Sequence, residues 1–176
     1  GLGDVYKRQA GLRAVAAHTS VERFEQDYEA EALFWKTVGA LDVAPGGMMA
    51  GCCDSLDGWL RGTRRLDALG ARLRAEGMRL SYHNHAVEFE TFPEDERCKL
   101  DILYDAASPQ HLFAELDTAW VYVGGSDPAA YIRKYAGRCP VIHVKDLAAE
   151  KRDGHPWFVP LGQGVLDWDD IFAAAA

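Results

Sequence analysis

Strand-like apolar runs alternate with helical patterns along most of this chain. The runs that predict strands are 12–18, 40–44, 78–83, 111–117 and 140–144. Successive strands lie roughly 30 to 40 residues apart with a helix between most of them, which is the spacing of βαβ units in a parallel sheet. No GxGxxG or GxxxxGK motif follows the first strand, so neither nucleotide fingerprint supports a doubly wound sheet. The pattern instead favours a (β/α)8 barrel.

Helix signals stand between these runs. Thr19 and Glu22 form a Thr-x-x-Glu capping box, which predicts one helix from Thr19 to Gly39. A second helix is predicted from Ser55 to Gly77, and an Asp127-Pro128 start predicts a third that runs to about residue 137. We also expect a short helix over 100–107 and a charged loop over 94–99.

The length of the chain limits how much of a barrel it can hold. A (β/α)8 barrel takes about 250 residues, and this chain has 176. The pattern supplies five of eight strands, so we expect an α/β (β/α)8 TIM barrel truncated at both ends. Residues 1–10 begin without Met and show no periodicity, and we interpret them as a non-native or disordered leader before a partial barrel over 11–176. Open parallel edges predict poor solubility or a homo-oligomer.

Composition excludes several classes of protein. The chain carries 19 Lys and Arg against 27 Asp and Glu, a net charge of −8, which disfavours nucleic acid as a partner. No apolar run approaches the ~20 residues that cross a bilayer, so we expect no membrane association. The four cysteines at 52, 53, 98 and 139 form no C-x-x-C pair, and a reducing cytoplasm is the expected location.

Polar residues follow the apolar runs at the points where strands should end. They are His18, His83, His85, Asp117 and His143. Such ends meet on one face of a parallel barrel, where active sites are built. One histidine at a strand end is more often structural than a ligand, but several with a carboxylate suit a divalent ion such as Mn²⁺, Zn²⁺ or Co²⁺.

Three further charged residues allow two interpretations each. Lys145 is either a solvated loop cation or the group that neutralises a substrate oxyanion. Glu88 and Glu90 are either exposed acids or, for one of them, part of the site.

Four segments resemble one known family. They are 82–89 (YHNHAVEF), 115–121 (ELDTAWV), 142–146 (IHVKD) and 158–168 (FVPLGQGVLDW). Together they resemble the sugar phosphate isomerase/epimerase family of xylose-isomerase-like TIM barrels. That group also contains inosose dehydratases, hydroxypyruvate isomerases, ketose 3-epimerases and endonuclease IV. The resemblance runs from about residue 11 to the end of the chain, and implies that the strands here are the third to the seventh.

The resemblance implies one divalent metal ion (Mn, Zn, Co or Mg). Asp117 and His143 match family ligands. His83 stands where the epimerases place a glutamate, so the two-glutamate mechanism of those enzymes is in question. The fourth ligand, a glutamate of the eighth strand, is expected beyond residue 176.

The resemblance also implies roles around the metal. His18, His85 and Trp120 would contact the substrate, a small sugar or polyol. Glu88 would remove the proton next to the carbonyl to give an enediolate, and a glutamate beyond residue 176 is an equal candidate. Lys145 would stabilise the negative charge that develops.

We therefore expect a metal-dependent isomerase or epimerase of a sugar, sugar phosphate or polyol. The alternatives are an inosose-type dehydratase and an inert or binding-only barrel with an incomplete site. A phosphodiesterase like endonuclease IV is disfavoured because it needs a basic DNA face.

Overall fold

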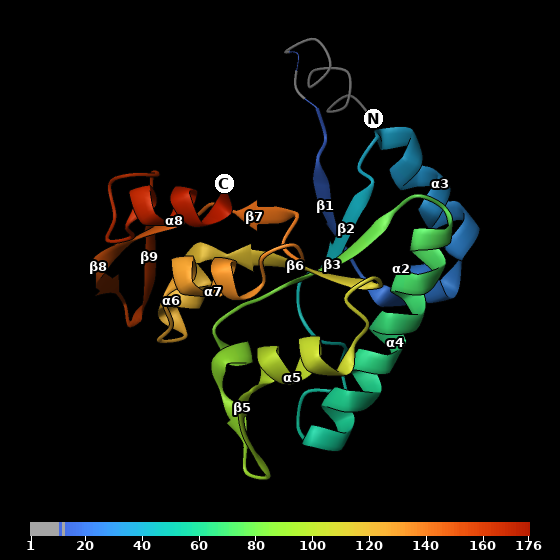
Figure 1. The fold of residues 1–176 in the computed structure, drawn as a ribbon, viewed down its shortest axis with the longest axis horizontal. Helices are drawn as coiled ribbons and strands as arrows, with labels where there is room; N and C mark the ends of the chain where they lie inside the picture. Colours follow the sequence, from blue (N-terminus) through green and yellow to red (C-terminus); the bar gives the residue numbers. More distant parts are fainter. Residues whose placement is uncertain (1–10, 12) are drawn as a thin grey trace.

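Five parallel strands form the sheet at the centre of the molecule (Figure 1). The computed structural model describes residue 11 and residues 13–176, so the leader expected at 1–10 lies outside the described residues. The strands stand in the order β1-β2-β3-β6-β7. Their bounds are β1 (Ala16–Thr19), β2 (Asp42–Pro45), β3 (Arg79–His83), β6 (Leu112–Asp117) and β7 (Val141–His143). This parallel half-barrel confirms the predicted fold class, and each strand overlaps a predicted run.

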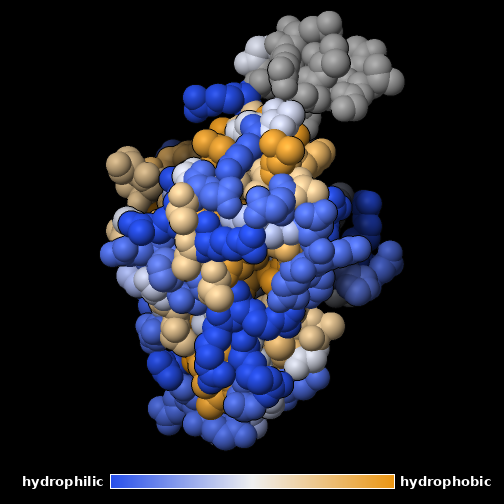
Figure 2. Space-filling model, turned by 90° about the vertical axis from the view of Figure 1, so that its right-hand side faces the viewer, coloured by the Kyte–Doolittle hydropathy of each residue, from blue (hydrophilic) through white to orange (hydrophobic). Residues whose placement is uncertain are grey.

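Helices flank the sheet in two groups (Figure 1). The first group lies beside β1 to β3 and comprises α2 (Val21–Gln26), α3 (Tyr28–Val38), α4 (Leu56–Ala75), α5 (Lys99–Ala106) and the 3-10 turn η1 (Val87–Phe89). The second group gathers near β6 and β7 and comprises α6 (Thr118–Val123), α7 (Pro128–Lys134) and α8 (Trp168–Ala175). Figure 2 shows that the side of the molecule where α2, α3 and α4 lie is mostly hydrophilic. Among the described residues, no helix has both the length and the apolar character needed to cross a membrane.

The prediction of one helix from Thr19 to Gly39 was wrong. Two helices occupy this segment, and the N-cap of the first is Ser20, whose hydroxyl accepts from the Arg23 amide at 3.4 Å. Thr19 is still the last residue of β1, and its hydroxyl donates to the buried Glu31 at 2.7 Å. Asp27 interrupts the helical path and caps α3. The capping box failed because Thr19 has a tertiary partner that the local pattern does not contain.

Other helix starts were predicted correctly. The Ser55 hydroxyl accepts from the Gly58 amide at 3.1 Å at the start of α4. The Asp127 carboxylate accepts from the Ala129 amide at 2.9 Å at the start of α7. Both caps depend on contacts within three residues, which a sequence pattern can reveal.

Two hairpins replace segments that were predicted as loops or not assigned. The charged stretch 94–99 contributes β5 (Asp95–Cys98), which pairs with β4 (Thr91–Phe92), so the loop prediction there was wrong. A longer hairpin joins β8 (Asp146–Arg152) to β9 (His155–Val159) next to the β7 edge. Its turn residues Asp153 and Gly154 both have positive φ (51° and 79°), as type I′ hairpin turns require.

The two faces of the sheet differ in chemistry. On β6, Leu112, Ala114 and Leu116 are buried in the apolar core under the helices. Burying a side chain of leucine size contributes about 1.5–3 kcal/mol, so this face holds the sheet to its helices. The alternate positions Glu115 and Asp117 are also buried but point to the opposite, polar face. That inner face carries the candidate site.

Candidate functional site

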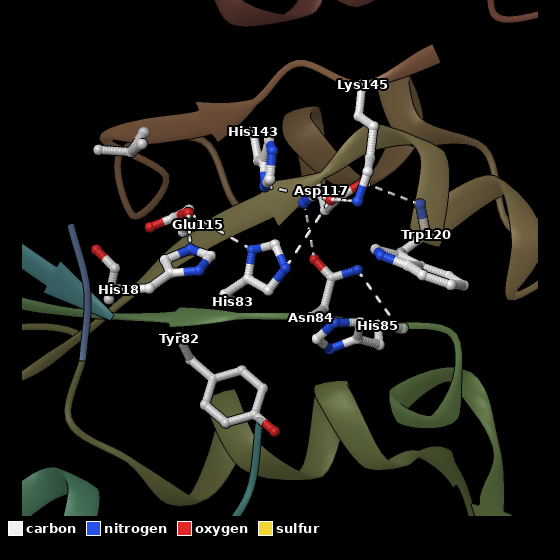
Figure 3. A network of polar contacts seen from close by, with 12 residues as sticks. His18, Tyr82, His83, Asn84, His85, Glu115, Asp117, Trp120, His143 and Lys145 are labelled. Atoms are coloured by element: carbon white, nitrogen blue, oxygen red, sulfur yellow. Dashed lines mark hydrogen bonds and ion pairs between the residues drawn. The ribbon is translucent and has the colours of Figure 1, made fainter. Parts of the chain in front are cut away.

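Three imidazoles and one carboxylate converge at the carboxyl ends of the strands (Figure 3). They belong to His18 on β1, His83 on β3, Glu115 on β6 and His143 on β7, and one ligand atom from each lies within 4.8 Å of the others. The centroids of the His18 and His83 rings are 4.5 Å apart, and those of His83 and His143 are 5.2 Å apart. We call these four residues the histidine cluster.

The strand register explains how residues so distant in sequence meet. His83 pairs with Glu115 across β3 and β6. On the other side, β2 separates His18 from His83, and the residue of β2 that pairs with His18 is Ala44. Because alanine has only a methyl group, the two imidazoles can approach each other over it.

Glu115 is the acidic centre of the histidine cluster. His18 Nε2 lies 2.7 Å from its Oε1 atom, and His83 Nδ1 lies 3.5 Å from the same atom. Burial opposes the charge of this carboxyl, but the hydrogen bond with His18 and the proximity of His83 outweigh burial and lower its pKa to about 2. Glu115 is therefore ionised at neutral pH and attracts cations.

Several polar atoms of the histidine cluster lack partners. Among the described residues, His83 Nδ1, Glu115 Oε2 and His143 Nδ1 are buried without a hydrogen bond. Buried polar atoms are almost always paired, and each exception needs an explanation. Imidazole nitrogen and carboxylate oxygen are the usual ligands of Zn²⁺ and of related divalent ions. The residues present fit a divalent cation.

Asp117, which the sequence predicted as a ligand, lies beside the histidine cluster. Its Oδ2 atom is 3.2 Å from His143 Nδ1, 3.3 Å from Lys145 Nζ and 3.9 Å from His83 Nε2. Its Oδ1 atom caps α6 by accepting from the Trp120 amide at 3.1 Å. Asp117 thus lies between the histidine cluster and the ammonium group of Lys145.

The residues predicted to contact substrate divide into two places. His85 and Trp120 lie against each other at one side of the site, with ring centroids 5.3 Å apart and ring planes tilted by 55°. Lys145 Nζ lies 5.4 Å from the Trp120 ring and 4.4 Å from the ring of Phe158, which the β8–β9 hairpin contributes. His18, in contrast, stands inside the histidine cluster.

Glu88, the predicted base, does not join the histidine cluster. It is buried in η1, where Oε1 accepts from the Tyr82 hydroxyl at 2.8 Å and Oε2 accepts from the His85 amide at 2.7 Å. Both oxygens are therefore engaged in holding the loop that carries His85.

Sequence reasoning did not assign a role to Glu115. The signal was present, because Glu115 and Asp117 are two residues apart on one strand and so share a face.

Comparison with known proteins adds sequence relatives. The model of the family described as xylose isomerase-like TIM barrel matches residues 13–176. An inosose dehydratase of Lacticaseibacillus casei is 27% identical over 132 residues, which cover 67% of this chain and 43% of that enzyme. The inosose dehydratase of Salmonella typhimurium is 32% identical over 87 residues, which cover 49% of this chain and 27% of that enzyme. The matches thus span less than half the length of these relatives.

Solved structures show the same fold. A sugar phosphate isomerase/epimerase from Parabacteroides distasonis superimposes with a TM-score of 0.80 at 19% identity, covering 97% of this chain and 62% of that one. An L-ribulose 3-epimerase superimposes with a TM-score of 0.64 at 18% identity, covering 97% of this chain and 60% of the other. Both likenesses extend over nearly the whole of the present chain.

Proposed function

Because this chain belongs to the xylose isomerase-like TIM barrel family, we propose that it forms the metal-binding part of a sugar or polyol isomerase or epimerase. The reaction would begin with removal of a proton next to a carbonyl. The observation that carries the proposal is the histidine cluster, with its buried and unpartnered nitrogen and oxygen atoms, at the carboxyl ends of the strands. That edge is where barrels of this kind build active sites.

His83, His143 and Glu115 would hold one divalent cation, with the Asp117 carboxylate beside them. When bound, such a cation supplies Lewis-acid polarisation of a carbonyl oxygen. Imidazole nitrogens from two strands and carboxylate oxygens from a third suit Zn²⁺, Co²⁺ or Mn²⁺ better than they suit Mg²⁺, which prefers oxygen ligands.

Other residues would bind the substrate and stabilise charge. The Lys145 ammonium lies against Asp117 and two aromatic rings, where it would offset negative charge that develops on a substrate oxygen. His85 and Trp120 would contact the apolar and hydroxyl groups of a small sugar or polyol. The contacts of Glu88 favour positioning of the His85 loop over the proton abstraction predicted from the sequence, because both of its oxygens already accept hydrogen bonds.

Isotope exchange tests this reaction. The protein is incubated with the metal and a panel of ketoses in D2O, and deuterium incorporation is followed by NMR. We expect incorporation at the carbon next to the carbonyl without loss of water, and we expect Lys145→Ala to slow it by roughly 100- to 1,000-fold, the range for groups that stabilise developing charge. Lys151→Ala, which removes an exposed lysine of the β8–β9 hairpin, is the matched control. Absence of exchange with every substrate would contradict the proposal.

A dehydratase is the second candidate. It is favoured by the similarity to inosose dehydratases at 27% identity. The same incubation with an inosose separates an isomerase from a dehydratase, because a dehydratase releases water from the carbon adjacent to the deprotonated one.

The cysteines also bear on where the protein acts. All four are free thiols, which suits the cytoplasmic location that we propose.

A further inference from the structure

His18, which the sequence predicted as a substrate contact, lies among the candidate metal ligands instead. It stands at the end of β1 with its Nε2 atom 2.7 Å from Glu115 Oε1, and it belongs to the four-residue group whose ligand atoms lie within 4.8 Å. Its ring is 6.0 Å from that of His143 and closer still to that of His83. His18 therefore faces the same point as the other two imidazoles.

A simple ion pair does not account for this arrangement. A structural histidine and carboxylate satisfy each other, whereas here two histidines approach one oxygen of Glu115 and leave Oε2 without a partner. His83 is only 3% exposed, and its Nδ1 atom is equally unpartnered among the described residues. Atoms that are buried and unpaired at the centre of a ring of donors indicate a place for a cation.

The charges around the two β6 carboxylates distinguish their roles. Asp117 has the Lys145 ammonium 3.3 Å from Oδ2, and a cation bound to that oxygen would be repelled by it. Its other oxygen caps α6. Glu115 has no lysine or arginine within ion-pair distance among the described residues. Glu115 is thus the better cation ligand, although the sequence predicted His83, Asp117 and His143.

From these contacts we propose that His18 is a metal ligand and that the centre consists of three imidazoles with the Glu115 carboxylate. A set with three nitrogen donors selects Zn²⁺, and after it Co²⁺, over Mn²⁺ and Mg²⁺, because imidazole suits the former and oxygen ligands suit the latter. The inference rests on the proposed metal centre, but not on the reaction assigned to it.

Metal titration tests both parts. The metal-free protein is titrated with ZnCl2, CoCl2, MnCl2 and MgCl2 by isothermal calorimetry, without any substrate. We expect one Zn²⁺ per chain and an affinity for Zn²⁺ at least ~10-fold above that for Mn²⁺. His18→Ala and His18→Gln should each weaken Zn²⁺ binding by at least the roughly 10–100-fold that the loss of an outer-shell partner costs.

The control and a second readout separate ligation from folding. His155→Ala removes an exposed histidine of β9 and should leave Zn²⁺ affinity unchanged. The visible absorption of the Co²⁺-loaded protein reports directly on the ligand set, and we expect the His18 variants to change it. His18 has a side chain that is 43% exposed on an edge strand, so both variants should keep the fold, which circular dichroism verifies.

Each contrary outcome has its own meaning. If His83→Ala abolishes Zn²⁺ binding while both His18 variants bind normally, His18 is not a ligand, although the metal centre stands. If Mn²⁺ or Mg²⁺ binds as tightly as Zn²⁺, the selectivity is wrong. If the unmodified protein binds none of the four ions, the metal centre of the proposed function fails together with this inference.

Discussion

Two buried carboxylates of this molecule have opposite surroundings. Asp146, at the root of the β8–β9 hairpin, is only 1% exposed and is saturated with hydrogen bonds. Its donors are the amides of Leu147 (2.9 Å), Gly162 (2.9 Å) and Gly164 (3.0 Å) and the indole of Trp168 (3.0 Å). Glu115, at the centre of the histidine cluster, is 4% exposed, and one of its oxygens has no partner.

The difference separates a structural acid from a functional one. Asp146 fixes the loop over 160–164 and the start of α8 with donors that belong to the chain itself. Glu115 keeps free capacity at a point that three imidazoles also face. Because both oxygens of Asp146 accept hydrogen bonds from the chain, we expect the stability of the protein to depend on Asp146. Because Glu115 Oε2 has no partner among the described residues, we expect ligand binding to depend on Glu115.

Removal of Asp146 should have the largest effect on stability. Asp146→Ala leaves four donors, one in a buried and three in partly buried hydrogen bonds, without their acceptor, and hydrogen bonds to a charged group contribute about 1.5–3 kcal/mol each without being additive. We expect a loss of about 3–4 kcal/mol in the free energy of unfolding, measured by urea denaturation. Asp169→Ala, at an exposed position of α8, should change it by less than about 0.5 kcal/mol. Equal losses of stability in Asp146→Ala and Asp169→Ala would contradict a structural role for Asp146.

Crowding of the same loop should have the next largest effect. A methyl group at Gly164 would clash with Asp146 Oδ1 and with the backbone oxygen of Leu147. Gly164→Ala should therefore cost roughly 1–3 kcal/mol of stability, the usual range for overpacking. Gly46→Ala is the matched control, because nothing lies within 4 Å of the added atom. Thermal unfolding of both variants decides the point.

Neutralisation of Glu115 should reduce stability less than removal of Asp146. In Glu115→Gln the side-chain oxygen still accepts from His18 and no buried donor loses its acceptor, so we expect a smaller loss of stability than for Asp146→Ala in the metal-free protein. The same substitution should abolish Zn²⁺ binding in the calorimeter. A loss of stability as large as that of Asp146→Ala would mean that Glu115 is a structural acid after all.

The smallest expected effect is a difference between Glu115 and Asp146 in how their contributions to stability depend on pH. The pKa of Glu115 is lowered from 4.5 to about 2, so its contribution to stability is complete above pH 4.5 and is lost as pH falls through 2. The hydrogen bond that His18 donates to Glu115 is the main cause that raises the pKa of His18 above 6.5, so the benefit of protonated His18 is lost as pH rises through that raised pKa. The stability difference between the wild type and Glu115→Gln should therefore be greatest between about pH 4.5 and 6.5.

For Asp146 the profile should have no decline at high pH. Burial opposes its charge, but the indole and amide donors outweigh burial and lower its pKa below 3.8. These donors do not titrate near neutrality. The difference between the wild type and Asp146→Asn should stay flat above pH 3.8 and shrink only as pH falls below it. Urea denaturation at several pH values checks both profiles, and a decline of the Asp146 difference at neutral pH would contradict the comparison.

The sequence predicted what depends on local pattern. The five strands of the half-barrel follow from apolar runs that alternate with helical patterns. The helix caps at Ser55 and Asp127 follow from contacts within a few residues. The first helix was wrong because Thr19 bonds to Glu31, twelve residues away. The β8–β9 hairpin was not predicted, although its turn, Asp153-Gly154, is a dipeptide typical of two-residue hairpins.

The candidate site was predictable in position but not in detail. Strand ends placed His83, Asp117 and His143 at one edge, where the structure has them. The contacts of His18 could not be predicted from the sequence. Its partner Glu115 is 97 residues away, and the close packing of the His18 and His83 rings depends on the small residue Ala44 on the intervening strand. Such contacts depend on register and curvature, which no local pattern contains.

The most direct test of the metal centre is the thermal stability of the protein with and without Zn²⁺. A ligand at 100 times its dissociation constant stabilises the native state by about 2.7 kcal/mol. For a chain of this size that corresponds to a rise in Tm of about 5–10 °C. We predict this rise for the wild type and none for His83→Ala. An unchanged Tm in the wild type, or an equal rise in both proteins, would contradict a metal centre at the histidine cluster.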